Sequence, residues 1–397
     1  MTLRTQVAII GAGPAGLVLA HLLRQSGIEC IVLESRNREY VESRVRAGVL
    51  EQGSVEILEE LGIATRMHQE GLVHRGIELG FNRQRHRIDF PSATGRSVTV
   101  YGQHEVIKDL LAAADERKVP VHFNVPDAAL HGLDSAAPSV TFSLGGTEQS
   151  LRCDYIAGCD GFHGISRVSV PTGVFAAYER VYPFSWLGIL AEAPPSQDEL
   201  VYMHSSRGFA LFSMRSPSIT RLYLQCDPGE DIQMWPDDRI WRELSLRFKC
   251  CDGWQPNQGR ILQKSITPMR SFVTEPMQYG RLYLAGDAVH IVPPTGAKGM
   301  NLALSDVRVL AQAFRKCYEL NDGSLLAEYS EICLRRIWRA QRFSWWMTSM
   351  LHRDPLANAF DEKRQLAELE YTVSSSAASQ SLAENYVGLP FEAMGDS

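Results

Sequence analysis

The segment 285–301 combines features that together could hold a sugar-containing cofactor. An apolar run over 281–285 predicts a strand that ends at Gly286 and Asp287. A carboxylate in that position can accept hydrogen bonds from the hydroxyl groups of a ribose or a polyol chain. After a Pro-Pro corner, the residues from Gly299 onward predict a helix whose positive N-terminal end faces the same place. The segment therefore predicts a site for a cofactor that becomes anionic.

A glycine-rich turn near the start of the chain predicts a dinucleotide site. Gly11, Gly13 and Gly16 fit the pattern G-x-G-x-x-G between a predicted strand and a predicted helix. Glu34 ends the next predicted strand, where its carboxylate can bind a ribose hydroxyl. Strand, helix and acid in this register favour dinucleotide binding over a structural turn. Because no second such pattern follows a later strand, the predicted dinucleotide is FAD.

The elements that must position these motifs form an α/β chain that begins as a doubly wound sheet. Predicted strands lie at 7–10, 30–34, 97–101, 152–157, 186–191, 200–203, 209–214 and 221–226. Predicted helices lie at 15–25, 105–118, 238–248 and 325–353, and a small, polar stretch at 374–381 predicts a loop.

Three regions follow from this order. We expect a Rossmann-like FAD-binding domain in 1–180, completed by 272–300. An inserted β-rich domain is predicted in 181–271, and a helical C-terminal region in 301–397.

Composition narrows the class of protein and of partner. The 397 residues carry a net charge of -6, which gives no electrostatic reason to expect nucleic acid or an anionic membrane as a partner. The 8 cysteines lack metal-ligand spacing, which predicts reduced thiols, a cytoplasmic protein and no metal site. The uncharged run 5–23 is broken by glycines and Pro14, which argues against a signal sequence or a membrane span.

A third motif links the first two to a known family. The run 159–167 follows a predicted strand and contains Asp160, His163 and Arg167, which alone would suit a tight surface turn. Together with 11–16 and 285–301, in this order, it resembles the flavoprotein aromatic hydroxylases, whose DG motif contacts both FAD and NAD(P)H. Further matching segments are 44–52, 155–167, 207–211, 343–349 and 384–390.

This resemblance implies a reaction. It implies that NAD(P)H reduces FAD and that O2 forms a flavin hydroperoxide, which hydroxylates 4-hydroxybenzoate to 3,4-dihydroxybenzoate. The FAD motifs alone are shared with flavin oxidases and dehydrogenases, and a non-enzymatic FAD-binding module is a third alternative. Substrate choice between 4-hydroxybenzoate, 4-aminobenzoate and related ring acids stays open.

The resemblance also implies a substrate pocket. Arg215 would pair with the substrate carboxylate, with Ser213 and Tyr223 as further hydrogen-bond partners. The implied catalytic groups are Tyr202 on the phenolic oxygen, Tyr386 on Tyr202, the Pro294 carbonyl, Asn301 beside the flavin, and His74 as the titratable end of a proton chain. Taken singly, each residue also has a purely structural explanation. Tyr202 and Tyr223 could be half-buried strand aromatics, Arg215 a solvated charge, and His74 a surface histidine. Removing the proton of a phenol at pH 7 costs roughly 4 kcal/mol, which explains the need for such a chain.

The cofactor residues follow from the same resemblance. Those implied for FAD are Gly11, Gly13, Ala15, Gly16, Glu34, Arg44, Arg46, Val49, Gln103, Asp160, Asp287, Gly299, Met300 and Asn301, and Lys298 would favour reduced flavin. Those implied for NAD(P)H are Arg36, Tyr40, Arg44, His163, Arg167 and Arg270. Ser35 follows Glu34 where relatives that demand NADPH often carry Arg, and Arg36 and Arg38 equally suit a solvated face. The choice between NADH and NADPH therefore stays open.

The last predicted long helix carries Trp338, Trp345 and Trp346 among regularly spaced arginines. This pattern favours a core or subunit-packing helix over a binding surface. With the family resemblance it predicts a homodimer. The segment 227–263 departs from the family pattern, which leaves the outer edge of the β-rich domain undefined.

Overall fold

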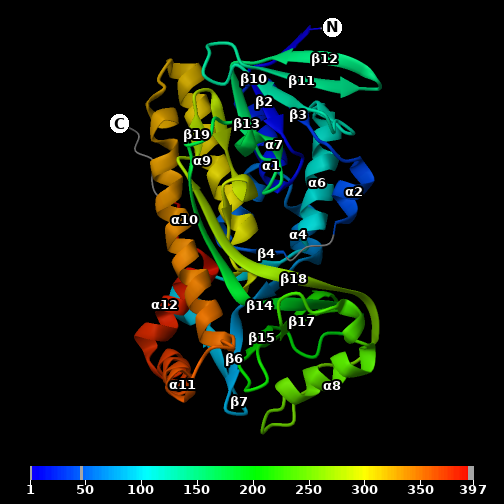
Figure 1. Cartoon of the computed structure of the whole chain (residues 1–397), viewed down its shortest axis with the longest axis vertical. Coiled ribbons are helices and arrows are strands. Elements are labelled where there is room, and N and C mark those ends of the chain that lie inside the picture. Colours follow the sequence, from blue (N-terminus) through cyan, green and yellow to red (C-terminus); the bar gives the residue numbers. More distant parts are fainter. Residues whose placement is uncertain (1, 45–47, 392–397) are drawn as a thin grey trace.

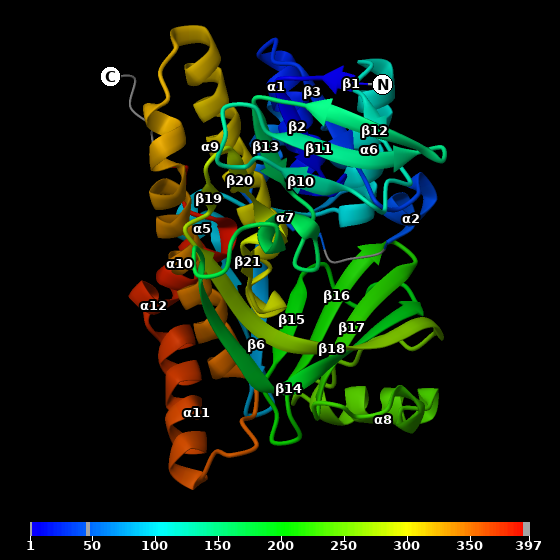
Figure 2. The ribbon, with the colours of Figure 1, turned by 45° about the horizontal axis from the view of Figure 1, so that its top comes forward.

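The computed structural model describes residues 2–44 and 48–391, and these residues form an elongated molecule with a sheet at each end (Figure 1). Two long helices, α9 (Gly299–Leu320) and α10 (Ser324–Leu351), run along one side of it. Figure 2 shows α7 (Ile165–Val168) and β21 (His290–Ile291), an edge strand of the second sheet, near the middle of the molecule. The motifs of the sequence therefore converge on the middle of the molecule.

The first sheet has the predicted Rossmann-like start. Its strand order is β19 (Gln278–Tyr279), β20 (Leu282–Leu284), β13 (Tyr155–Gly158), β2 (Val7–Ile10), β3 (Cys30–Leu33) and β9 (Val121–His122). The four central strands pair in parallel, and every residue of β2 and β13 is buried. Parallel strands covered on both faces are expected to be apolar throughout, as these are. The predicted strands at 7–10 and 30–34 are confirmed.

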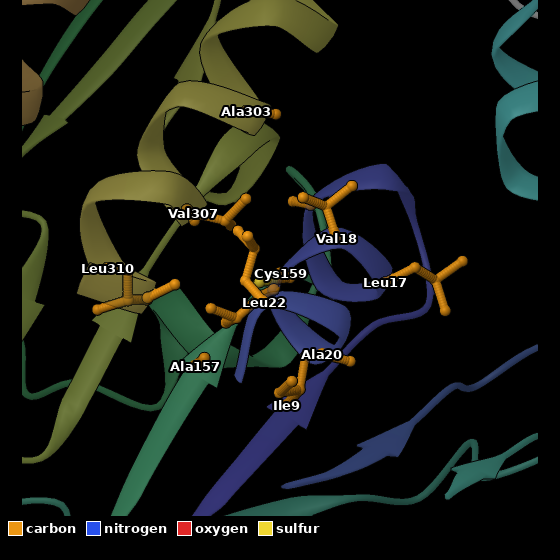
Figure 3. Packing of buried hydrophobic residues seen from close by; sticks show 14 of the residues in the cluster. Ile9, Leu17, Val18, Ala20, Leu22, Ala157, Cys159, Ala303, Val307 and Leu310 are labelled. Atoms are coloured by element: carbon orange, nitrogen blue, oxygen red, sulfur yellow. The ribbon is translucent and has the colours of Figure 1, made fainter. Parts of the chain in front are cut away.

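Helix α1 (Pro14–Gln25) packs this sheet against α9. Leu22 of α1 lies beside Val307 and Leu310 of α9 (Figure 3), and all three side chains are buried. Val18 lies one turn from Leu22 on the same face of α1. Fully burying such aliphatic side chains contributes roughly 1.5–3 kcal/mol each. The contact holds the glycine-rich turn before α1 close to the start of α9.

The second sheet is larger and contains the predicted β-rich strands. Its order is β21, β18 (Arg260–Glu275), β14 (Ala176–Glu192), β17 (Ile219–Cys226), β16 (Ala210–Ser216), β15 (Leu200–Met203), β6 (Gly76–Phe81) and β7 (Gln84–Asp89). The strands predicted at 186–191, 200–203, 209–214 and 221–226 are confirmed. Helix α8 (Asp237–Arg247) lies at the end of the molecule away from the first sheet (Figure 1, Figure 2).

Strands β6 and β7 were not predicted from the sequence. They join the second sheet because β6 pairs in parallel with β15, although more than 100 residues separate them along the chain. The glycines of β6 and the charged residues of β7 hide the alternation that marks a strand. The second sheet thus takes in strands outside 181–271, and the boundaries at 180, 271 and 301 stay a prediction.

Two smaller sheets and several short helices complete the first part of the described chain. One sheet has the order β1 (Thr2–Arg4), β12 (Thr147–Arg152), β11 (Ser139–Leu144) and β10 (Ala129–His131), and the other β4 (Val49–Leu50), β8 (Val98–Val100) and β5 (Leu72–His74). The short helices are α2 (Arg38–Ser43), α3 (Gln52–Glu60), α4 (Thr65–Glu70) and α5 (Phe90–Thr94), and the longer α6 (Gln103–Glu116) follows β8.

The C-terminal region is helical as predicted, with one error. Helices α11 (Ala359–Ser374) and α12 (Ser376–Val387) replace the loop predicted at 374–381. The side chain of Ser375 accepts a hydrogen bond from the Ala378 amide and so caps the start of α12. Small polar residues therefore mark a helix cap and an exposed helix face here. Among residues 2–44 and 48–391, we find no helix long and apolar enough to span a membrane.

Candidate active site

The glycine-rich turn leaves the start of α1 open to a ligand. A Cβ on Gly16 would lie 2.0 Å from the carbonyl oxygen of Gly11, and one on Gly11 would lie 2.5 Å from that of Cys159. Both glycines are required by the close approach of backbone segments. Gly13 differs, because a Cβ there would meet nothing within 4 Å. The amides at the start of α1, including that of Ala15, can therefore face a pyrophosphate.

Glu34 is fixed at the end of β3 beside this turn. Its Oε2 accepts a hydrogen bond of 2.8 Å from the Ala12 amide, and its Oε1 accepts one of 2.8 Å from the Arg36 amide. A carboxylate has about four acceptor positions, so capacity for a ribose hydroxyl remains. The geometry suits the predicted role of Glu34.

Asp160 has one oxygen that the described chain does not satisfy. Its Oδ2 accepts hydrogen bonds from the amide and the hydroxyl of Ser166, at 2.8 and 2.9 Å. Its Oδ1 is buried without a partner among the described residues. Burial raises the pKa of Asp160, against the hydrogen bonds from Ser166. A buried oxygen without a donor is uncommon, and a hydroxyl of a bound dinucleotide would satisfy it.

The loop that carries Asp287 is hydrogen-bonded to Asp306 of α9. Gly286 has φ +65, and its amide donates to Oδ2 of Asp306 at 2.9 Å. The same oxygen lies 2.6 Å from Nε2 of His290, and the attraction of Asp306 outweighs burial and raises the pKa of His290. A Cβ on Gly286 would lie 3.6 Å from the Cβ of Ala15. The loop with Asp287 thus adjoins the start of α1, as one cofactor spanning both motifs requires.

Asn301 joins the start of α9 to strand β4. Its Nδ2 donates to the carbonyls of Val49 and Ala297, each at 2.9 Å. Its Oδ1 accepts hydrogen bonds from the Glu51 amide at 2.9 Å and from Ser54 Oγ at 2.7 Å. Because an amide side chain has two donors and two acceptor positions, all are used within the protein. The predicted role of Asn301 beside the flavin would therefore be exerted through the position of α9.

Lys298 forms a buried ion pair that the sequence analysis did not assign. Its Nζ lies 2.6 Å from Oε1 of Glu51 and also donates to the carbonyl of Tyr386 at 3.1 Å. Burial lowers the pKa of Lys298, and the attraction of Glu51 opposes that shift. Glu51 lies in the segment 44–52, which matches the family, so this match could have indicated a role for Glu51.

The remaining described FAD candidates lie at the ends of helices. Arg44 is exposed after α2, and Gln103 is the first residue of α6. Gly299 and Met300 begin α9 and are half-buried. Arg46 lies outside the described residues.

The predicted substrate residues share one face of the second sheet. Leu211 pairs with Tyr202 on one side and with Tyr223 on the other, which places the two tyrosines in one row across the sheet. Ser213 and Arg215 follow Leu211 by two and four residues and point to the same side. A register shift between 214 and 216 marks a bulge at Arg215, and bulges often redirect a side chain.

Arg215 is held in place and keeps donor capacity. Its Nη1 donates to Ser213 Oγ at 3.0 Å and to the Met214 carbonyl at 2.8 Å, and its Nη2 lies 3.5 Å from the Tyr223 hydroxyl. Its Nε is buried without a partner among the described residues. Burial opposes ionisation of Tyr223, but the charges of Arg215 and Arg221 outweigh it and lower the pKa of that phenol. This arrangement suits a carboxylate ligand.

Tyr202 and Tyr386 form the predicted pair. Their hydroxyl oxygens lie 2.6 Å apart, and each residue is only 1% exposed. Burial raises the pKa of both phenols, so both stay protonated at neutral pH and can donate hydrogen bonds. Phe90 stacks on the ring of Tyr386, with 5.1 Å between ring centroids.

The surroundings of Pro294 suit its predicted role, whereas those of His74 suit it less well. Pro294 is exposed, and its carbonyl accepts a hydrogen bond of 3.0 Å from the Ala297 amide, which leaves a second lone pair. His74 is 0% exposed, and neither ring nitrogen has a partner among the described residues. The resemblance implies a group that titrates near neutral pH, whereas burial lowers the pKa of His74 to about 4. The role of His74 therefore stays a prediction.

The predicted NAD(P)H residues fall into two groups. Around Phe162, the guanidinium of Arg167 lies 4.6 Å and that of Arg270 4.8 Å from the ring centroid, and His163 is exposed beside them. Arg167 also donates to the carbonyl of Ala288 at 2.9 Å, so it joins two motifs.

The second group lies at α2. The guanidinium groups of Arg36 and Arg44 lie 5.4 and 5.9 Å from the ring centroid of Tyr40. Arg38 forms ion pairs with Glu42 at 2.7 Å and with Asp115 at 2.8 Å.

Two neighbours of Tyr223 were missed by the sequence analysis. Arg221 lies with its guanidinium 5.1 Å from the centre of the Tyr223 ring, in space that Gly188 leaves free. Its position two residues before Tyr223 on one strand face was a usable signal. Trp186 packs 4.7 Å from the same ring and donates to Nε2 of His352 at 2.6 Å. His352 lies 166 residues further along the chain, so no local pattern indicates it.

Comparisons with known proteins agree with this geometry. A family model described as an FAD binding domain matches residues 4–344. The chain is 49% identical over 392 residues to p-hydroxybenzoate hydroxylase of Acinetobacter baylyi, a match that covers 98% of this chain and 97% of that protein. It is 28% identical to rifampicin monooxygenase of Streptomyces venezuelae, over 76% of this chain and 62% of that protein.

A solved structure supports the fold. The p-nitrophenol 4-monooxygenase of Pseudomonas putida DLL-E4 superposes with a TM-score of 0.82 at 17% identity, covering 98% of this chain and 99% of that chain. The resemblance proposed from the sequence motifs is confirmed. The chain therefore belongs to the family of FAD-dependent monooxygenases that includes p-hydroxybenzoate hydroxylase.

Proposed function

We propose that this FAD-dependent monooxygenase hydroxylates 4-hydroxybenzoate at the ring carbon next to the phenol, giving 3,4-dihydroxybenzoate. One observation supports the proposal most strongly: Arg215, a partly satisfied guanidinium, and Tyr202 lie on one face of the second sheet. The Tyr202 hydroxyl contacts that of Tyr386 from α12. A ring acid with a carboxylate at one end and a phenol at the other matches both.

Arg215 would bind the carboxylate. The planar fork of arginine matches two carboxylate oxygens, and burial strengthens such charge-assisted hydrogen bonds. Ser213 and Tyr223 orient the guanidinium through the contacts already described and present hydroxyl groups beside it. The ring would then point away from this anchor towards Tyr202.

Tyr202 would hold the phenolic oxygen as its proton leaves. A phenol of pKa near 10 is ionised to only about one part in a thousand at pH 7, so an anion-stabilising donor is required. The substrate proton would pass to the Tyr202 hydroxyl as Tyr202 gives its own proton to Tyr386, whose hydroxyl lies 2.6 Å away. The raised pKa of Tyr202 disfavours its ionised form, so after the transfer it is again a donor to the substrate oxygen. His74 stays proposed as a later station despite its low pKa.

Bound FAD would take a hydride from NAD(P)H and activate O2 for insertion into the ring. Gly11, Gly13, Glu34, Asp160 and Asp287 would hold it, as the open turn and the unsatisfied Asp160 oxygen suggest. Lys298 and the start of α9 supply positive potential that favours an anionic reduced cofactor.

Both nicotinamide coenzymes stay candidates. Arg38 is engaged by two carboxylates, whereas Arg36 stacks on Tyr40 and presents its charge at the surface. If NADPH is preferred, Arg36 is the better placed partner for its 2′-phosphate. Steady-state assays with NADH and NADPH on Arg36→Ala decide this, since a selective loss with NADPH is expected only in that case.

We further propose a cytoplasmic homodimer that uses the C-terminal helical region. Trp338 and Trp345 on α10 are 42% and 43% exposed, unusual for tryptophan, and all 8 cysteines are free. Sedimentation equilibrium should give twice the chain mass, and Trp345→Glu should shift it towards the monomer.

The decisive assay measures products as well as coenzyme use. Purified enzyme with FAD, O2 and NAD(P)H is expected to form 3,4-dihydroxybenzoate in nearly equal amount to the coenzyme consumed. A panel with 4-aminobenzoate and other ring acids then defines the substrate range. Full conversion of O2 to peroxide without hydroxylated product would identify an oxidase instead.

A further inference from the structure

Arg336 of α10 joins residues 389–390 to Glu51 at the start of α3. Its Nη1 donates to the carbonyls of Leu389 and Pro390, at 2.9 and 3.2 Å. Its Nη2 lies 3.3 Å from Oε2 of Glu51. One guanidinium therefore joins the segment that follows α12 to a buried carboxylate at the start of α3.

Glu51 is also the partner of Lys298, and both residues contact the chain around Tyr386. Glu51 and Lys298 are 5% and 4% exposed. Lys298 donates a hydrogen bond to the backbone carbonyl of Tyr386. The side-chain hydroxyl of Tyr386 in turn contacts the hydroxyl of Tyr202. A Cβ on Gly388 would lie 2.1 Å from Oε2 of Glu51, so only glycine lets the chain run past this carboxylate.

The segment beyond Gly388 is seated by further contacts. The ring of Phe391 lies 4.9 Å from the guanidinium of Arg336 and 5.4 Å from that of Arg308. A Cβ on Gly53 would lie 2.7 Å from the same ring. The segment 388–391 is thus packed across α3, α9 and α10.

Loss of Arg336 would leave several groups without their partner. Glu51, which is buried, would retain one cation, and the half-buried Leu389 carbonyl would lose its donor, which is costly where burial restricts water. The carbonyl of Pro390 is exposed and could turn to water. Tyr386 is the next to last residue of α12, and one residue separates it from the segment 388–391. A hydroxyl contact of 2.6 Å between two buried side chains is sensitive to small displacements of either backbone.

We propose that Arg336 is a positioning residue for the Tyr202 and Tyr386 pair. Through Glu51 and the carbonyls of Leu389 and Pro390 it fixes the backbone after Tyr386, and thereby the hydrogen-bond chain that receives the substrate proton. This inference rests on the proposed function, and it adds Arg336 and the segment 388–391 to the machinery of proton handling.

The test follows the ionisation of bound 4-hydroxybenzoate by its ultraviolet absorbance across pH, together with the yield of 3,4-dihydroxybenzoate per NAD(P)H. Arg336→Gln in the full-length enzyme with FAD should raise the midpoint, the pH at which half of the bound 4-hydroxybenzoate is ionised, by about one unit. This corresponds to a roughly tenfold lower phenolate fraction at neutral pH. Removing a nearby positive charge and loosening Tyr386 both act in this direction. The product yield should fall several-fold, with an unchanged flavin spectrum.

Two further variants sharpen the result. Arg336→Lys keeps the charge but cannot reach two carbonyls and a carboxylate together, so its midpoint should be intermediate. Arg335→Gln removes a neighbouring exposed arginine that pairs with Glu331 at 2.9 Å, and it should behave as wild type.

Each outcome bears on one claim. Wild-type hydroxylation with an unchanged midpoint and yield in Arg336→Gln would overturn the positioning role alone. If the Gln variant does not fold, a wild-type midpoint in Arg336→Lys overturns it. A wild-type enzyme that makes no hydroxylated product would overturn the proposed function and this inference with it.

Discussion

At the scale of single residues, the site depends on contacts between distant parts of the chain. Tyr202 and Tyr386 are 184 residues apart, and no local spacing predicts that their hydroxyl groups meet. The family resemblance supplied this pair, whereas the structure supplied Glu51, which the quoted motif contained without an assigned role. Burial also lowers the pKa of His74, an effect of the surroundings that a sequence does not display.

Replacing Arg215 with Ala tests the carboxylate anchor. Loss of the charge-assisted hydrogen bonds should cost about 2–3 kcal/mol of binding, or roughly 30- to 150-fold in apparent KM for 4-hydroxybenzoate. Steady-state kinetics check this, with exposed Arg260→Ala as a matched control. An unchanged KM would remove Arg215 from the carboxylate site.

Replacing Tyr202 with Phe tests the phenol contact. The variant keeps the ring and its packing but loses the donor to the substrate oxygen and the 2.6 Å contact with Tyr386. Coenzyme oxidation should continue while peroxide replaces most of the hydroxylated product, as measured by the ratio of product to NAD(P)H. Normal coupling in this variant would refute the assigned role.

At the scale of elements, local patterns were reliable where the element is stabilised by its neighbours in sequence. The β2, α1 and β3 unit matches its prediction because an apolar strand, a glycine turn and a helix follow directly. Strand β6 forms a local hairpin with β7, but it was missed because its glycines and the charged residues of β7 hide the alternation that marks a strand. Helix α12 was missed because its cap residues read as a loop.

Two glycines of the turn before α1 should respond differently to Ala. Gly16→Ala places a Cβ 2.0 Å from a carbonyl and should destabilise even the protein without FAD. Gly13→Ala meets no atom within 4 Å and has φ -76, so that protein should keep its melting temperature. The affinity of the Gly13→Ala variant for FAD should nevertheless fall about tenfold, because the added methyl group would occupy the space of the pyrophosphate. Thermal unfolding and fluorescence titration with FAD distinguish them, and equal FAD affinity in Gly13→Ala would contradict the proposed cofactor contact.

At the scale of the whole molecule, α10 ties the two buried cores together. Ile337 belongs to the core of the first sheet and Phe343 to that of the second, so the FAD motifs and the substrate face are packed against one helix. Their relative position is a property of the complete chain. The geometry of the site therefore depends on contacts between the two cores, which cross the predicted domain boundaries.

Buried His74 should make the fold acid-sensitive. The folded-state pKa of His74 is lowered to about 4 from a usual 6.5, so its contribution is fully present above pH 6.5 and is lost as pH falls towards 4. Between pH 7 and pH 5 this amounts to about 2 kcal/mol of unfolding free energy. Urea unfolding at both pH values should show the loss, and His74→Asn should reduce it. Identical pH dependence in that variant would show that His74 is not its source.

The most direct measurement of the central claim uses ¹⁸O-labelled dioxygen. Enzyme with FAD, NAD(P)H and 4-hydroxybenzoate is incubated under labelled O2, and the product is identified by chromatography and mass spectrometry. We predict 3,4-dihydroxybenzoate that carries one labelled oxygen, formed in near-equal amount to the NAD(P)H oxidised. Labelled peroxide alone, or a product whose new oxygen comes from water, would contradict it.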